Sequence, residues 1–145
     1  MQQIPAYKLI PHRDSMLLID SFTPMEPGQG RAETTLTESS IAATASGEID
    51  SLILVELIAQ AYAALKGWEF TQAGMDIPIG YLVGVQKFTV LGAPQTDQLL
   101  TIEVATLGEF DGFAIIEGTV SNGDTTLASG KIKLWAPDGA SEDET

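Results

Sequence analysis

Apolar residues along the chain fall into one long block and several shorter alternating runs. The long block, residues 51–68, contains only two charged side chains and has the length of a helix. Asp50 or Ser51 can cap its amino end, and Gly67 or Gly74 can help to end it. Because apolar residues lie on nearly every face, we expect this helix to be buried on most sides, as a sheet wrapped around it would do.

The region before the helix has the pattern of a hairpin. Residues 15–23 form an apolar run typical of a buried strand, and residues 27–30 contain the glycine and proline of a turn. The threonine-rich, alternating residues 31–37 then read as the returning strand. Residues 38–48 are small and polar and predict a loop, with one turn of helix over residues 39–45 as the alternative.

After the helix, the alternation and the turn residues predict four further strands. They cover residues 81–91, 99–107, 113–120 and 125–135. Asn122-Gly123 is a strong hairpin signal between the last two. The order is therefore hairpin, central helix and an antiparallel meander of four strands, an α+β layout. The open edge of such a sheet pairs naturally with a second copy.

Length and charge narrow the class of protein. The 145 residues suit one domain over residues 1–137, followed by an acidic tail, residues 138–145, which we expect to be disordered. The net charge of −13 disfavours binding to nucleic acid or to anionic lipid. No apolar run is long enough to span a membrane, and the amino-terminal residues do not resemble a signal peptide, so we expect a cytoplasmic protein.

Three side chains are candidates for chemistry. Glu56 is a carboxylate inside the most apolar block, where it is costly unless it is paired or used; the alternative is a purely structural hydrogen bond. His12, the one histidine, can transfer protons near neutral pH, although a lone loop histidine is more often ordinary surface. Gln60 lies one helical turn after Glu56 and can hydrogen-bond to it, or is simply a tolerated polar residue.

Other chemistries find no support in the residue types. Without cysteine and with one histidine, only carboxylates remain to bind a metal, and we expect no metal site. No serine lies in a Gly-x-Ser-x-Gly elbow, and no glycine-rich loop connects a strand to a helix. We therefore expect no cofactor.

Two stretches together resemble the hotdog-fold dehydratases that act on 3-hydroxyacyl thioesters of acyl carrier protein. Residues 9–20, with Pro11-His12-Arg13 before an apolar run ending in Asp20, are similar to the opening segment of that family. Residues 54–60 are similar to its central-helix segment, with Glu56 in the place of the catalytic Glu and Ala59-Gln60 after it. The resemblance covers roughly residues 7–135.

The resemblance implies a hotdog fold, in which an antiparallel sheet wraps around one long helix, and a Glu56 that acts on substrate. The main family carries its catalytic histidine in a loop just before the helix, whereas residues 41–51 contain none. The chain is therefore closer to a divergent subgroup of predicted dehydratases, some linked to aryl-polyene synthesis, and His12 becomes the expected catalytic histidine. Asp50 is the alternative acid or base, and the backbone near Ser51 is the expected contact for the thioester carbonyl, with Asp50 and Gln60 also expected at the substrate.

The resemblance also implies a carrier and an assembly. The substrate would be carried by acyl carrier protein or by coenzyme A, and the protein would form a homodimer or a larger homo-oligomer. Two other functions remain open. One is an acyl thioesterase, because hotdog proteins also use a helix carboxylate against thioesters. The other is a non-catalytic subunit that binds acyl groups or serves as a scaffold for an active relative.

Overall fold

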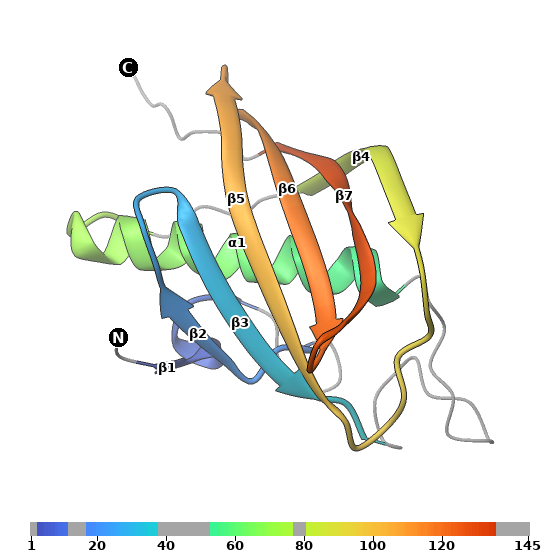
Figure 1. Cartoon of the computed structure of the whole chain (residues 1–145). Coiled ribbons are helices and arrows are strands. Elements are labelled where there is room, and N and C mark those ends of the chain that lie inside the picture. The colour runs from blue at the N-terminus through green and yellow to red at the C-terminus, as the bar shows by residue number, and fades with distance from the viewer. Residues whose placement is uncertain (1–2, 12–16, 38–52, 77–80, 136–145) are drawn as a thin grey trace.

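The structure is a computed structural model of the chain that describes residues 3–11, 17–37, 53–76 and 81–135. In this part of the chain, one antiparallel sheet with the strand order β1-β2-β3-β5-β6-β7-β4 curves around one long helix, α1 (Figure 1). The elements are β1 (Ile4–Pro5), the 3-10 turn η1 (Ala6–Lys8), β2 (Ser21–Pro24), β3 (Gln29–Thr35), α1 (Ile53–Gln72), β4 (Tyr81–Val90), β5 (Leu99–Phe110), β6 (Phe113–Asn122) and β7 (Thr125–Trp135).

The predicted hairpin is present as β2 and β3, which pair from Ser21 with Glu33 to Pro24 with Gly30. The apolar run before it is only partly strand, because residues 17–20 are irregular although Leu18 and Ile19 are buried. Strand β1, which adds to the edge of β2, has no counterpart among the predicted elements. The predicted loop over residues 38–48 lies outside the described residues.

The predicted meander of four strands is wrong in one respect. Strands β5, β6 and β7 do form a meander, but β4 does not pair with β5, the next strand along the chain. It pairs with β7 instead, from Tyr81 opposite Trp135 to Val90 opposite Ala128, and forms the far edge of the sheet. The alternation within a run predicts a strand but carries no information about its neighbour, because pairing is decided by the three-dimensional packing of the sheet on the helix.

Helix α1 is longer than predicted, because it continues to Gln72 and Gly74 follows with a φ of +71°. Gly67 therefore lies inside the helix rather than at its end. One side of α1 packs on β2, β3, β5, β6 and β7. A second side packs on the segment that precedes β2, whose Leu9, Ile10 and Leu18 are buried. The expected burial on most sides is thus achieved by the sheet together with this amino-terminal segment.

The core between sheet and helix consists mainly of aliphatic side chains, with Phe22 and Tyr62 among them. Its largest fully buried apolar members are Ile19, Phe22, Leu54, Leu57, Ile58, Leu65, Leu100, Ile102, Ile116, Val120 and Ile132. Among the helices of the described residues, none combines the length and the apolar character needed to cross a lipid bilayer.

Candidate active site

Glu56 lies in the first turn of α1 and is half-buried. One turn further along the helix, Gln60 is almost completely buried, with 1% of its surface exposed. The side-chain nitrogen Nε2 of Gln60 donates a hydrogen bond to Oε2 of Glu56 over 3.0 Å. The predicted contact between these two residues is confirmed, and a carboxyl group in an apolar helix has gained a neutral hydrogen-bond donor.

The other end of the Gln60 amide forms a hydrogen bond with a residue outside α1. Its Oε1 accepts a hydrogen bond from the backbone N–H of Leu18 over 2.9 Å. The carbonyl of Leu18 in turn accepts a hydrogen bond from Oγ1 of Thr34 on β3, and Thr34 is also 1% exposed. We call this chain of contacts from Glu56 through Gln60 and the Leu18 backbone to Thr34 the amide bridge. It satisfies polar groups whose burial without partners would be costly.

The same side of α1 meets the amino-terminal segment at a second point. Gly67 lies against Leu9 so closely that a Cβ atom at this position would be 2.1 Å from the Leu9 carbonyl oxygen. Glycine in the middle of a helix is otherwise unfavourable, and here the close approach of two backbones requires it. Leu9 and Leu18, both in contact with α1, flank the stretch that contains residues 12–16.

His12, Asp50 and Ser51 lie outside the described residues. Their expected roles, with His12 as the catalytic histidine and Asp50 and Ser51 at the substrate, therefore stay predictions. The expected contact of Gln60 with substrate also stays a prediction. Of the candidates, the structure brings Glu56 and Gln60 together.

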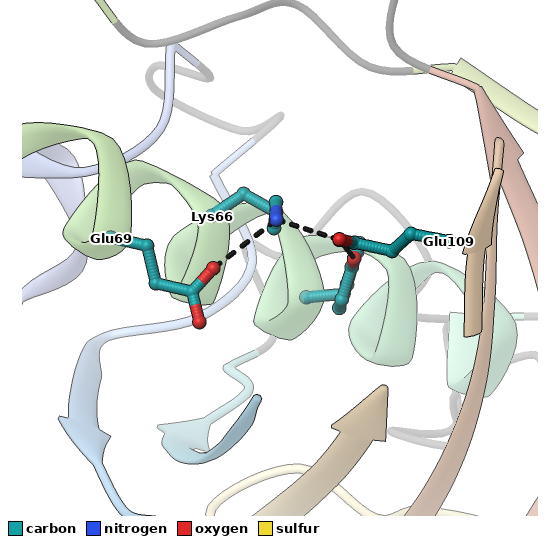
Figure 2. A network of polar contacts seen from close by, with 4 residues as sticks. Lys66, Glu69 and Glu109 are labelled. Atoms are coloured by element: carbon teal, nitrogen blue, oxygen red, sulfur yellow. Dashed lines mark hydrogen bonds and ion pairs between the residues drawn. The ribbon is translucent and has the colours of Figure 1, made fainter. Parts of the chain in front are cut away.

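A second polar group on α1 was not foreseen from the sequence. The Nζ of Lys66 lies 3.2 Å from Oε1 of Glu69 and 2.7 Å from Oε2 of Glu109, which is on β5. The hydroxyl of Tyr62 donates a hydrogen bond to the same Glu109 oxygen over 3.0 Å. Figure 2 shows Lys66 between the two carboxylates. We call Tyr62, Lys66, Glu69 and Glu109 the rim cluster.

A β-bulge directs Glu109 towards the helix. The register of β5 against β6 shifts between Thr106, opposite Ile116, and Gly108, opposite Ile115. After this extra residue, Glu109 lies opposite the buried Ala114 and shares its inward face. Without the bulge, alternation would place Glu109 on the outer face. The Lys66–Glu69 pair follows from helical spacing, but the sequence contains no comparable signal for Glu109.

The groups of the rim cluster shift one another's pKa values. Burial alone would raise the pKa of Glu109, but the hydrogen bond and charge of Lys66 outweigh it and lower that pKa below its ordinary value of 4.5. Burial would lower the pKa of Lys66, yet the bond and charge of Glu109 raise it above 10.5. Burial, followed by the charge of Glu109, raises the pKa of the Tyr62 hydroxyl strongly. At neutral pH Glu109 is therefore ionised, Lys66 is protonated and Tyr62 is neutral.

The described residues offer little for a metal ion. Within residues 3–11, 17–37, 53–76 and 81–135, no three carboxylate or imidazole side chains gather in a way that could hold one. The chemistry available at Glu56 is that of a carboxyl group, which can accept or donate a proton next to a neutral amide.

Comparisons with known proteins agree with this fold. The sequence model of the ApeP-like family, described as ApeP dehydratase, matches residues 4–144. No curated protein sequence matches the chain. Among solved structures, the dehydratase heterocomplex ApeI:P from Xenorhabdus doucetiae contains a similar chain, with a TM-score of 0.86 and 20% identity over 94% of this chain and 93% of that one.

Two further structures are similar at a lower level. A hypothetical thioesterase with coenzyme A from Streptococcus pneumoniae TIGR4 has a TM-score of 0.58 and 16% identity over 79% of this chain and 83% of that one. The PaaI protein of the phenylacetic acid degradation operon of E. coli has a TM-score of 0.60 and 14% identity, over 79% and 80%. At these identities the likenesses show a shared fold, and the expected hotdog fold is confirmed. Since the family model spans almost the whole sequence, the chain belongs to the ApeP dehydratase family.

Proposed function

We propose that the protein removes water from a 3-hydroxyacyl thioester on acyl carrier protein and forms the trans-2-enoyl thioester. The observation that carries this proposal is the half-buried carboxyl of Glu56, held by the neutral amide of Gln60 in the first turn of the central helix. A dehydration needs a group that can give a proton to a departing hydroxyl, and a carboxyl next to a neutral donor suits that task in a dehydratase family.

The proposed reaction uses two proton carriers. The imidazole of His12 removes the proton from the α-carbon, and Glu56 in its protonated form gives a proton to the 3-hydroxyl. The carbon–oxygen bond breaks, the double bond forms between the α- and β-carbons, and water leaves. Backbone N–H groups near Ser51 would stabilise the negative charge on the thioester oxygen at the positive end of the helix. Loss of the proton from His12 and its return to Glu56 through solvent then reset the site.

The contacts of the amino-terminal segment support a role for His12. Leu9 touches α1 at Gly67, and Leu18 is bonded to Gln60 on the same helix. His12 lies between these two contact points in sequence, three residues after Leu9 and six before Leu18. In the proposed enzyme, His12 acts with Glu56 of the same chain or of a second subunit.

The edge strand β4 supports an assembly of two subunits. It is ten residues long, and its outer side has no strand partner in the described part of the chain. Val85 and Val90 lie opposite the buried Ile132 and Ala128, on the inner face, yet are 48% and 47% exposed. We propose that β4 pairs with β4 of a second copy, which would cover both the edge and these side chains. Sedimentation of the purified chain at the mass of a dimer is the expected result.

A carrier protein with acidic residues would need basic residues on this acidic chain. Lys66 is engaged by Glu69 and Glu109 in the rim cluster and is not available. Lys87 and Lys131 lie opposite each other on β4 and β7, with Glu117 as the next residue across the sheet. We propose that these two lysines contribute to docking of the carrier.

A second candidate function is that of a subunit which is active only with a relative. The similar structure from Xenorhabdus doucetiae is a heterocomplex, which favours this candidate over the thioesterase. In that case β4 would pair with a different hotdog chain. Glu56 and the rest of the amide bridge would then form part of an active site that the two chains share.

The test is mass spectrometry of 3-hydroxyacyl groups incubated with the protein, loaded in parallel on acyl carrier protein and on coenzyme A. We expect loss of one water from the carrier-bound acyl group with the wild type and no loss with His12→Ala. Release of free thiol instead of water would identify a thioesterase. An unchanged substrate with the chain alone, but dehydration after addition of a hotdog relative, would identify the second candidate. Absence of any reaction in all arms would contradict the dehydratase function.

A further inference from the structure

The chemistry of its partners fixes the orientation of the Gln60 amide. A backbone N–H can only donate, so the Gln60 atom 2.9 Å from the Leu18 nitrogen must be the carbonyl oxygen Oε1. Nε2 then necessarily faces Glu56, where it donates to Oε2 over 3.0 Å. A flipped amide would place two donors against each other at Leu18. Gln60 can therefore act only as a donor towards Glu56.

This orientation distinguishes the two oxygens of the Glu56 carboxyl. Oε2 faces an N–H group and serves as an acceptor whether the carboxyl is charged or neutral. In the neutral form the proton consequently belongs on Oε1, because a proton on Oε2 would compete with the Gln60 donor for the same oxygen. The amide bridge thus selects the oxygen from which a proton can be given.

The bridge also joins Glu56 to Leu18, which lies just before β2. Gln60 is 1% exposed and binds the Leu18 backbone, which Thr34 holds from the side of β3. A shift of Leu18 relative to the helix would break a buried hydrogen bond to Gln60 and release the donor to Glu56. The position of the segment and the orientation of the carboxyl are therefore linked through one side chain.

We propose that Gln60 is a positioning residue that aligns the Glu56 carboxyl with the Leu18 backbone and directs the reacting proton to Oε1. This inference rests on the proposed dehydratase function. It differs from the expectation that Gln60 binds substrate, because both polar atoms of its buried amide already have partners within the protein. A substrate contact would have to displace a buried hydrogen bond to the backbone.

Three variants separate positioning from other roles. Gln60→Met keeps the size of the side chain but removes both hydrogen bonds of the bridge. Gln60→Glu keeps an acceptor for Leu18 but replaces the donor to Glu56 by a second carboxyl. Thr34→Val is the matched control, because it removes a buried hydrogen bond to the same Leu18 residue and leaves Gln60 in contact with Glu56.

The assay follows formation of the enoyl group from a 3-hydroxyoctanoyl thioester of acyl carrier protein, with the full chain as purified. For both Gln60 variants we expect kcat to fall about 10- to 100-fold, the size of effect that a misplaced reacting group produces. We expect KM to change by less than about threefold, since substrate binding is not the affected step. Thr34→Val should retain kcat within about twofold even where its melting temperature falls as far as that of Gln60→Met.

Amide hydrogen exchange at Leu18 checks the bridge without any turnover. We expect exchange to be roughly tenfold faster or more in Gln60→Met, and much less affected in Gln60→Glu, which keeps the acceptor. Unchanged exchange in Gln60→Met would show that the bond to Leu18 does not form.

The kinetic outcomes each decide the proposal. A raised KM with unchanged kcat would make Gln60 a substrate-binding residue, and an equal loss of kcat in Thr34→Val would make its effect structural. An unaffected Gln60→Met enzyme overturns the positioning role but leaves the dehydratase intact. An inactive wild type contradicts the proposed function itself, and with it the catalytic purpose of Gln60, whatever the exchange at Leu18 shows.

Discussion

Two glutamates are bonded to side chains of helix α1 in different ways: Glu56 in the amide bridge and Glu109 in the rim cluster. Glu56 is bonded to the neutral, buried amide of Gln60. Glu109 is bonded to the ammonium of Lys66 (Figure 2) and, in addition, to the hydroxyl of Tyr62. Both carboxyls contact the same helix within a few turns of each other. The partner of Glu56 in the amide bridge is neutral and that of Glu109 in the rim cluster is charged, and we propose that this difference separates a group that can react from one that supports the fold.

The comparison shows what a charged partner does to a carboxyl. An ammonium favours the ionised form, and the pKa of Glu109 is accordingly lowered once the charge of Lys66 outweighs the effect of burial. An amide donor can bond to a carboxyl in either state of protonation. Glu109 is therefore an anion at neutral pH, whereas the neutral amide of Gln60 suits the proton exchange that we propose for Glu56.

The strongest test of this comparison replaces each carboxyl by an amide of the same shape. Glu56→Gln should reduce dehydration about 10²- to 10⁴-fold, because it removes the proposed proton donor while its amide oxygen can still accept from Gln60. Glu109→Gln should leave turnover within about twofold. Enoyl absorbance measures both, with circular dichroism to show that the fold is retained. If Glu109→Gln loses as much activity as Glu56→Gln, the assignment of roles is wrong.

An effect of intermediate size is expected where α1 meets the amino-terminal segment. Gly67→Ala would place a methyl group 2.1 Å from the Leu9 carbonyl oxygen, so helix and segment must separate. We expect a loss of about 1–3 kcal/mol in the free energy of unfolding, measured with urea. Gly84→Ala is the matched control, since a Cβ there meets no atom within 4 Å. Equal stability of the two variants would mean that the segment does not pack on the helix in this way.

The smallest effect concerns the rim cluster and its pH dependence. Lys66→Met removes the charge that lowers the pKa of the half-exposed Glu109, and we expect a loss of at most about 1 kcal/mol at neutral pH. In the wild type, the contribution of Glu109 is complete above its ordinary pKa of 4.5 and is lost as the pH falls through its lower, folded value. That of Lys66 is complete below 10.5 and is lost as the pH rises through its raised value.

The difference in unfolding free energy between wild type and Lys66→Met should therefore be flat between about pH 5 and pH 10 and shrink on either side. Urea titrations at several pH values measure it. Lys87→Met is the control, because Lys87 is exposed and has no ion pair in the part of the chain that the structure describes. A loss that does not vary with pH would show that Lys66 acts through the packing of its alkyl chain.

The sequence predicted the individual elements better than their arrangement. The central helix, the β2–β3 hairpin and the last strands were predicted from periodicity and turn residues, which are local properties. The pairing of β4 with β7 was not, because the side chains of β4 alternate in the same way whichever strand lies beside it. The short β1 adds backbone hydrogen bonds at an edge and has no pattern of its own.

The site was predicted in part for the same reason. The contact between Glu56 and Gln60 follows from their spacing of four residues along a helix. The second half of the amide bridge was missed because the partner of Gln60 is a backbone N–H, and every residue except proline carries one. Glu109 was missed because the bulge in β5 changes which residues face inwards.

Because of that bulge, the pairing register of β5, rather than the identity of its residues alone, decides which side chain reaches the helix. If the same residues paired with β6 without the bulge, simple alternation would turn Glu109 to the solvent and Phe110 inwards, whereas loss of the extra residue would leave Glu109 opposite Ala114. Relatives of this chain that keep the length of β5 but pair it without the bulge would align well by sequence and still present a different group at this end of α1. When such chains are compared, inward-facing positions of β5 should therefore be matched by strand register rather than by residue number.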